Sequence, residues 1–190
     1  MKTITLLSAN LLAVLVLSTS SVAWADSEAS ERTREINMLS SAKISPSEAL
    51  SAAEKETGAR ATAIGFEKHD GEFLYEIRTA SKDGSSTVFV NPASGAVTED
   101  KGNGLLSFLY GWDEDGDFEV IGQSSISLAS AISIAERQTG GTALEARFSD
   151  DDEAPTLEVE VAGRGGSRRV TIDGHGGNVL KIAPVDDDMD

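Results

Sequence analysis

The sequence predicts an α+β protein of two tandem modules, each one helix packed on a three- to four-stranded antiparallel sheet. Two observations predict this. The sequence matches itself without a gap at an offset of 82 residues, and in each copy a helical apolar pattern precedes strand-like alternation. Because the offset is even, equivalent apolar positions fall on the same face of their strands.

The repeat relates residues 44–99, called module 1 below, to residues 126–182, called module 2. Identical residues recur along the whole repeat, at helix ends, strand positions and turns. They include Ile44 with Ile126, Ala53 with Ala135, Gly58 with Gly140, Phe66 with Phe148, Glu76 with Glu158 and Gly95 with Gly177. The chain is therefore expected to contain the same small fold twice.

Each module opens with residues that favour a helix. In module 1, Ser45 is a suitable N-cap, Pro46 suits the first helical position, and Glu48 completes a Ser-x-x-Glu capping box. Gly58 can adopt the left-handed conformation that ends a helix. The second helix is expected over 127–140, with one apolar stripe of Leu128, Ala131, Ile132 and Ala135. So short a helix must dock on other elements to be stable.

The segments after each helix alternate between apolar and polar residues, as half-buried strands do. Polar turns such as Lys82-Asp83-Gly84 separate them. The inward-facing sets are Thr62, Ile64 and Phe66, then Phe73, Tyr75, Ile77 and Thr79, then Val88 and Val90, matched by Leu144, Ala146 and Phe148, then Leu157, Val159 and Val161, then Val170 and Ile172. A helix is expected to cover one face of each sheet.

These motifs resemble those of the PepSY domain. The resemblance rests on Ser-Pro-x-Glu-Ala at 45–49, Ala-Glu-Lys-x-Thr-Gly at 53–58, Tyr-Glu-Ile at 75–77 and Val-x-Val-Asn-Pro-x-Ser-Gly-x-Val at 88–97. Module 2 is similar at 135–140 and 170–173 but departs at its closing turn, Asp173-Gly174-His175-Gly176-Gly177. PepSY domains occur in propeptides of thermolysin-like metalloproteases and in exported proteins, which implies an inhibitory or protein-binding role.

The N-terminus has the layout of a secretory signal. Lys2 precedes an apolar run over residues 4–17, and Ala23-Trp24-Ala25 offers a cleavage site. The run is shorter than the roughly 20 apolar residues of a membrane span. We therefore expect a signal peptide at 1–25, a mature chain with a lead-in at 26–43 and no membrane span, and a periplasmic or secreted location in a bacterium. An uncleaved N-terminal anchor is the alternative.

The mature chain would carry 15 basic and 32 acidic residues, a net charge of −17. Such a chain is repelled by phosphate backbones, so nucleic acid is not expected as a partner. The acidic residues concentrate in the linker 100–125 and the tail 183–190. The sequence has no cysteine, which excludes disulfides, thiol nucleophiles and thiolate metal sites.

No pattern of catalytic residues is present, so the chain is not expected to be an enzyme or to need a cofactor. A related zinc protease would need His-Glu-x-x-His, whereas the two histidines, His69 and His175, lie in separate predicted turns. The acidic run Asp113 to Asp117 fails as an EF-hand, because with Gly116 at position 6 the end ligands would be Gly111 and Gly122. No metal ligand is therefore assigned.

Two sets of residues are predicted to bind a protein partner. The linker contains an unusual apolar segment, and Leu105, Phe108, Tyr110 and Trp112 could either pack between the modules or anchor a partner. The sheet face away from the helices should carry Glu76 in module 1 and Glu158 in module 2. That acidic face would suit a basic protein surface, or could be an ordinary solvated face.

These observations favour an exported, non-catalytic protein-binding module of the cell envelope that inhibits or regulates a protease. The alternative is an acidic envelope protein that responds to calcium or another cation, as the acidic runs 113–117 and 186–190 suggest.

Overall fold

The computed structural model describes residues 22–99, 121–149 and 154–185. Within these ranges the helices are α1 (Val22–Ser40), α2 (Pro46–Thr57) and α5 (Leu128–Thr139). The strands are β1 (Arg60–His69), β2 (Glu72–Ser81), β3 (Gly84–Val90), β4 (Val97–Glu99), β5 (Thr142–Ser149), β6 (Thr156–Gly163), β7 (Gly166–Asp173) and β8 (Val179–Pro184).

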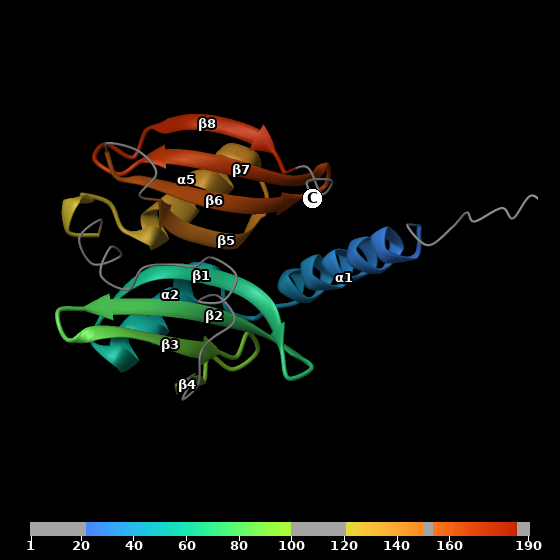
Figure 1. Cartoon of the computed structure of the whole chain (residues 1–190), viewed down its shortest axis with the longest axis horizontal. Helices are drawn as coiled ribbons and strands as arrows, with labels where there is room; N and C mark the ends of the chain where they lie inside the picture. The colour runs from blue at the N-terminus through green and yellow to red at the C-terminus, as the bar shows by residue number, and fades with distance from the viewer. Residues whose placement is uncertain (1–21, 100–120, 150–153, 186–190) are drawn as a thin grey trace, which may run out of the picture.

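The described strands form one eight-stranded antiparallel sheet in the order β4-β3-β2-β1-β5-β6-β7-β8 (Figure 1). The expectation of a separate sheet in each module is therefore wrong. In an isolated module β1 would be an edge strand, with a row of unpaired backbone groups along its outer side. The same is true of β5, and the two edges satisfy each other by pairing.

The strands β1 and β5 meet at a seam of three residue pairs centred on Ile64 and Ala146. These two residues are equivalent in the repeat, because their numbers differ by 82. The flanking pairs, Ala63 with Arg147 and Gly65 with Glu145, are exchanged by the repeat, because Ala63 is equivalent to Glu145 and Gly65 to Arg147. The seam therefore joins the modules about a local two-fold axis.

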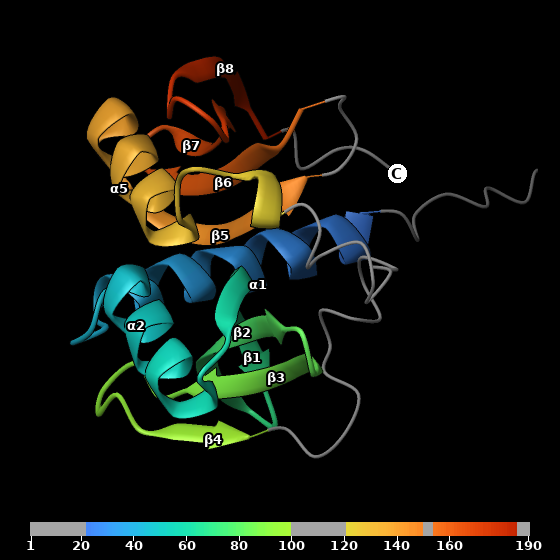
Figure 2. The same ribbon diagram turned by 90° about the vertical axis from the view of Figure 1, so that its left-hand side faces the viewer.

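The helices α2 and α5 lie side by side on one face of the sheet (Figure 2). Each contacts the strands of its own module, and the two helices contact each other. The core between helices and sheet is continuous across the seam. Its largest fully buried apolar side chains include Tyr75, Phe66, Leu50, Ile64, Ile77, Ile132, Leu157 and Ile172. The inward and outward positions predicted from strand alternation are thus observed in both modules.

The predicted capping box at α2 is formed. The Ser45 hydroxyl accepts a hydrogen bond from the Glu48 N–H at 3.3 Å, and the Glu48 carboxylate accepts from the Ser45 N–H at 2.7 Å. The hydrogen bonds that the Glu48 carboxylate accepts from the Ser45 N–H and the Ser45 hydroxyl hold its pKa below the usual value. At α5, Ser127 accepts from the Ser130 N–H, and no acidic residue stands in the first turn. The glycine that ends each helix has a φ near +70°.

A second contact is repeated in both modules and explains the shared Ala-Glu pair near the helix end. The Glu54 carboxylate accepts a hydrogen bond from the Ala61 N–H at 3.0 Å, and Glu136 accepts from the Ala143 N–H at the same distance. Each of these alanines stands where the ladder register shifts, at a β-bulge. The glutamate thus satisfies a backbone donor at an irregular point of the ladder.

The closing turns also have the same geometry, although their sequences differ. The Pro92 carbonyl accepts from the N–H groups of residues 43 and 44, and the Gly174 carbonyl accepts from those of 125 and 126. The Asn91 side chain caps its turn by accepting from two N–H groups, and Asp173 does the same in module 2. These bonds lower the pKa of Asp173. The closing turn of module 2 therefore differs in sequence from that of module 1 but keeps the same hydrogen bonds.

Helix α1 was not predicted, since only a lead-in was expected before residue 44. It lies between β5 and β1 in Figure 2 and contacts both strands. Ile36 and Leu39 are its described residues that pack against the core. Among the residues that the structure describes, no helix combines the length and apolar character needed to cross a membrane.

Gly141, between α5 and β5, lies so close to β6 that there is no room for a side chain. A Cβ at this position would overlap the Ala162 carbonyl and lie 2.8 Å from a Val161 methyl carbon. We expect Gly141→Ala to lower the free energy of unfolding by roughly 1–3 kcal/mol, measured by urea denaturation. Gly165→Ala is the matched control, because a Cβ there meets nothing within 4 Å. Equal stability of the two variants would contradict the close approach at Gly141.

Candidate binding interface

Three glutamates from both modules line up on the sheet face away from α2 and α5. Gly65 on β1 is paired with Glu76 on β2 and with Glu145 on β5, and Glu145 is paired with Glu160 on β6. Directly opposed residues of antiparallel strands share a face, about 5 Å apart. The row therefore crosses the seam, and Gly65 leaves a place without a side chain between two carboxylates.

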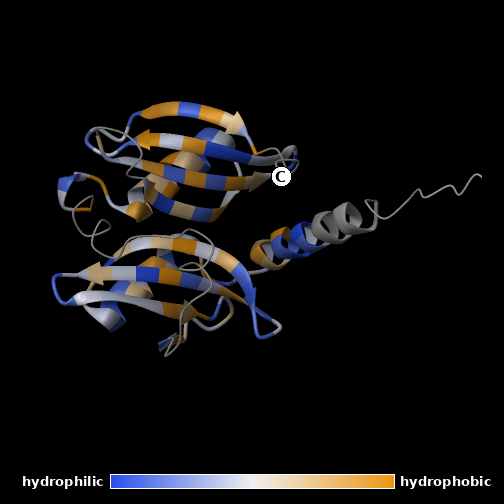
Figure 3. Cartoon of the chain, viewed as in Figure 1, coloured by the Kyte–Doolittle hydropathy of each residue, from blue (hydrophilic) through white to orange (hydrophobic). Residues whose placement is uncertain are grey.

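A row of cations lies two residues further along the same face. Ala63 on β1 is paired with Arg78 on β2 and with Arg147 on β5. The Arg147 guanidinium donates two hydrogen bonds to one oxygen of Glu158, at 2.7 and 3.2 Å. The two rows, together with Glu158, are called the charged face below. In Figure 3 the strands accordingly alternate between hydrophilic and hydrophobic colours.

Much of the charged face is buried. Glu76 is only 1% exposed, Arg78 4% and Glu160 7%. The expectation that this face is open to solvent is therefore wrong for Glu76, whereas Glu158 is half-buried in its ion pair with Arg147. A buried carboxylate is strongly destabilising unless it is paired or protonated, so these groups depend on their neighbours.

Helix α1 supplies part of that pairing. Its Arg32 donates to the Glu35 carboxylate at 3.0 Å and to the Ser167 hydroxyl at 3.4 Å, and it forms an ion pair with Glu160 of β6. Lys68 and Glu31 also approach each other, at 3.8 Å, but both are exposed and the pair contributes little. Arg32 thus connects α1 to the carboxylate row of module 2.

Glu67 on β1 is buried near other carboxylates, and both the burial and these neighbours raise its pKa. Burial, and to a lesser extent the nearby negative charges of Glu76, Glu145 and Glu35, together raise the pKa of Glu67 to about 7. Burial also raises the pKa of Glu35, against the opposing effect of Arg32. These carboxylates come from α1, β1, β2 and β5, so both modules and the helix between them contribute to one group of neighbouring carboxylates.

The predicted site residues are only partly placed by the structure. Leu105, Phe108, Tyr110 and Trp112 lie outside the described residues, and so does the acidic run 113–117. Glu76 and Glu158 both lie on the charged face, on equivalent strands of the two modules. That they bind a partner stays a prediction.

The structure adds residues that the sequence did not single out. Arg32 and Glu35 of α1 lie near the carboxylates of the charged face, to which Glu145 of β5 belongs, although α1 and β5 are far apart in the chain. Only the β1–β5 register brings Glu145 next to Gly65, and nothing in the repeat indicates that register. Arg32 and Glu35 are three residues apart, the spacing at which opposite charges pair on a helix, and this spacing can be read from the sequence.

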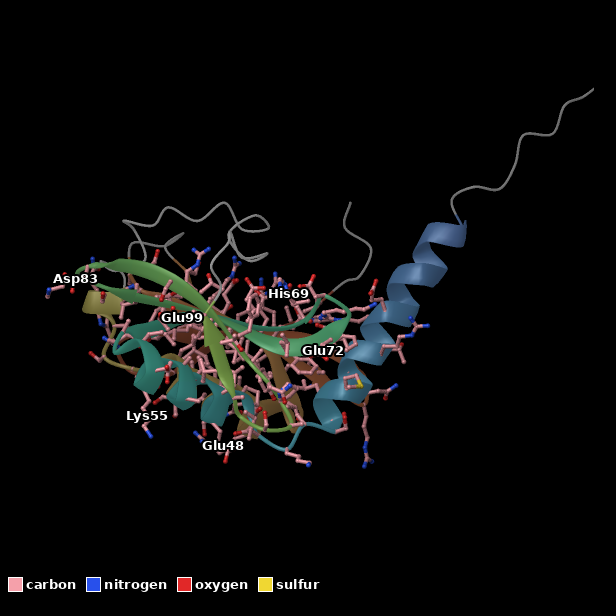
Figure 4. The ribbon with its side chains drawn as sticks, turned by 90° about the horizontal axis from the view of Figure 1, so that it is seen from below. Glu48, Lys55, His69, Glu72, Asp83 and Glu99 are labelled. Carbon is pink, nitrogen blue, oxygen red and sulfur yellow. The ribbon has the colours of Figure 1, made fainter. Side chains whose placement is uncertain are left out.

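His69 lies on the same side of the sheet as the charged rows, whereas His175 lies in a turn of module 2. His69, at the β1–β2 hairpin, stacks on Phe89 with ring centroids 4.3 Å apart. It lies on the opposite side of the sheet from Glu48 and Lys55 of α2 (Figure 4). His175 is exposed in the closing turn of module 2. Among the described residues, no group of three or more histidine and acidic side chains is arranged to hold a metal ion.

A cleft of about 400 Å³ lies on the other side of the molecule, where the end of α1 meets the start of α2 and residues from both modules. Its polar lining groups are largely engaged. Glu48 caps α2, Glu136 holds the bulge at Ala143, and the Tyr75 hydroxyl donates to the Ile44 carbonyl at 2.8 Å. These groups of the cleft therefore already have partners within the chain.

The chain belongs to the PepSY family. The family model, described as the peptidase propeptide and YPEB domain, matches residues 43–101 and again 125–183, more than half of the chain. Domains of this family are generally propeptide or regulatory domains without catalysis of their own.

Among solved structures, the chain is similar to a candidate lipoprotein from Clostridium difficile 630, with 17% sequence identity and a TM-score of 0.44. The match covers 75% of this chain and 93% of that protein. A comparison with curated proteins gives no match.

The cluster around Glu67 predicts a pH-dependent stability. Because its pKa is raised in the folded state, Glu67 contributes stability at low pH that is lost as the pH rises towards and through about 7. Between about pH 5.5 and pH 8 this loss should be on the order of 2 kcal/mol. Urea denaturation at the two pH values measures it.

Glu67→Gln should reduce this pH dependence, because the amide has no charge to bury. Glu72→Gln, on the same hairpin but exposed, serves as the control and should keep the native pH dependence. If both variants keep it, the titrating group lies elsewhere.

Proposed function

We propose that this chain is an exported, non-catalytic protein-binding module of the cell envelope that inhibits or regulates a protease. The observation that carries the proposal is the charged face, to which two PepSY modules contribute matched strands on either side of one seam. A partner bound across the seam would contact both modules at once. The periplasmic or secreted location belongs to the same proposal and rests on the signal-like N-terminus.

The charged face suits protein recognition because its charges are held in fixed positions. Arg147 and Glu158 form a hydrogen-bonded pair on adjacent strands, so little side-chain freedom is lost when a partner binds. Arg147 and Glu158 are also among the more accessible members of the charged face, and a fixed pair of opposite charges favours partners with a complementary pattern and disfavours others. The relation of the family to peptidase propeptides favours a protease as that partner.

A charge exchange tests the face without removing its ion pair. The variant Arg147→Glu with Glu158→Arg keeps opposite charges on the two strands but inverts what a partner meets. We expect the native chain to inhibit a thermolysin-like metalloprotease fraction from envelope extract, and the exchanged variant to lose at least ~10-fold in affinity. Residual peptidase activity against inhibitor concentration measures this.

The matched control exchanges Lys82 and Asp83, an exposed ion pair of 2.7 Å in the β2–β3 hairpin. This variant should inhibit like the native chain. Inhibition that survives the Arg147 and Glu158 exchange would exclude the charged face as the binding site. Absence of inhibition and of binding for every protease fraction would refute the regulatory role.

The cation-responsive alternative stays a prediction from the sequence, because its acidic runs lie outside the described residues. A ligand that binds only the folded state raises the thermal midpoint. If the alternative holds, millimolar calcium should raise the melting temperature of the chain, whereas an equal concentration of sodium should not. An unchanged midpoint with calcium would leave the alternative unsupported.

A further inference from the structure

Four cationic residues of module 2 lie on or next to β7 and β8, the last two strands at that end of the sheet. Arg168 and Arg169 lie on β7, Lys181 lies on β8, and Arg164 lies in the hairpin between β6 and β7. All four are exposed, and none forms a side-chain hydrogen bond or ion pair within the described part of the chain. These residues are called the basic edge below.

The fold does not require the basic edge, as the repeat shows. At the offset of 82 residues its members correspond to Lys82, Ser86, Thr87 and Glu99 of module 1. Module 1 thus has one cation in these four places, and that cation is paired with Asp83. In a chain with twice as many acidic as basic residues, four unpaired cations on one pair of strands are a property of module 2 alone.

The cations of the basic edge project to both faces of the sheet. Arg169 is paired with Glu160, and Lys181 with Thr171, so both lie on the side of the sheet away from α2 and α5. Arg168 is paired with Val161, whose side chain belongs to the core, so it lies on the face of α2 and α5. The carboxylates of an extended acidic peptide also alternate between two faces, because successive side chains of a strand point in opposite directions.

The outer side of β8 is the end of the sheet (Figure 1) and has few backbone groups for further pairing. The Val185 N–H donates to the Ser167 carbonyl at 3.0 Å, so by alternation Ile182 and Pro184 direct their backbone groups away from β7. Pro184 has no N–H, and the ladder is irregular beside Leu180. Leu180 and Ile182 are 59% and 44% exposed. Attraction at this edge is therefore mainly electrostatic, with a small apolar contact.

We propose that the basic edge binds an extended acidic segment of a partner protein lying along β8. A short peptide meets mainly the local field of the four cations, because charges beyond about 10 Å are screened at physiological salt. A broad anionic surface such as a membrane would also meet the acidic remainder of a chain whose total net charge is −16. This site is separate from the charged face and would take a partner of opposite charge.

Fluorescence anisotropy of a labelled peptide of about ten glutamates, titrated with the full chain, tests the proposal. We expect binding at about 100 mM NaCl, where the screening length is about 10 Å, that weakens at least ~10-fold at about 500 mM. Arg168→Glu with Arg169→Glu should weaken binding at low salt by a further ~10-fold or more. Lys55→Glu with Lys82→Glu makes the same change in net charge outside the basic edge and should leave the affinity within about twofold.

Thermal melts establish that each variant is folded, and Arg168→Gln with Arg169→Gln replaces the charge-reversed variant if that variant does not fold. The proposal is overturned if both double variants weaken binding equally, since net charge alone would then explain the attraction. The proposal is also overturned if the affinity for the peptide does not change with salt concentration, or if the peptide does not bind at all. Preference for vesicles of phosphatidylglycerol over the peptide would overturn it as well. Arg168 lies on the opposite side of the sheet from Arg147 and Glu158, so Arg168→Glu alone should weaken peptide binding while protease inhibition persists, which separates this proposal from the function proposed above.

Discussion

Backbone pairing between β1 and β5 is the constraint on which the other features depend. It brings α2 and α5 into contact over one core and places Gly65 between glutamates of different modules. It also creates the line along which α1 contacts both halves of the sheet. Since only three residue pairs form this seam, the helices above it and the ion pairs of Arg32 on α1 reinforce the connection. A change that separated the seam would disturb the core and the charged face together.

Local features were predictable from the sequence, whereas contacts between the modules were not. The Ser45 capping box, the glycine that ends each helix and the inward side of strands β1 to β3 and β5 to β7 follow from short-range sequence patterns. The union of the two sheets depends instead on two edges meeting, and both edges have the ordinary alternation of any strand. Similarly, alternation places Glu76 on the outer face but does not indicate that it is 1% exposed. Exposure depends on what covers a face, and that is a property of the whole chain.

The two modules share one backbone fold but differ in the charges on their outer strands. Glu54 and Glu136 hold equivalent bulges, and Asn91 and Asp173 cap equivalent turns, so the residues that fix the fold are equivalent in chemistry. The outer strands are not under that constraint. There, module 2 has unpaired arginines where module 1 has serine and threonine. A duplicated fold can thus present different surfaces at its two ends without altering the core that supports them.

The symmetry of the seam has a consequence for assembly. Ile64 is paired with its own repeat equivalent, Ala146, so the contact is nearly isologous although it occurs within one chain. The same register would form if module 1 of one molecule paired with module 2 of another, with every native hydrogen bond of the seam retained. Strand exchange of this kind needs no new interface and becomes more favourable as protein concentration rises. The geometry that joins the halves of a monomer is therefore also the geometry of a domain-swapped dimer.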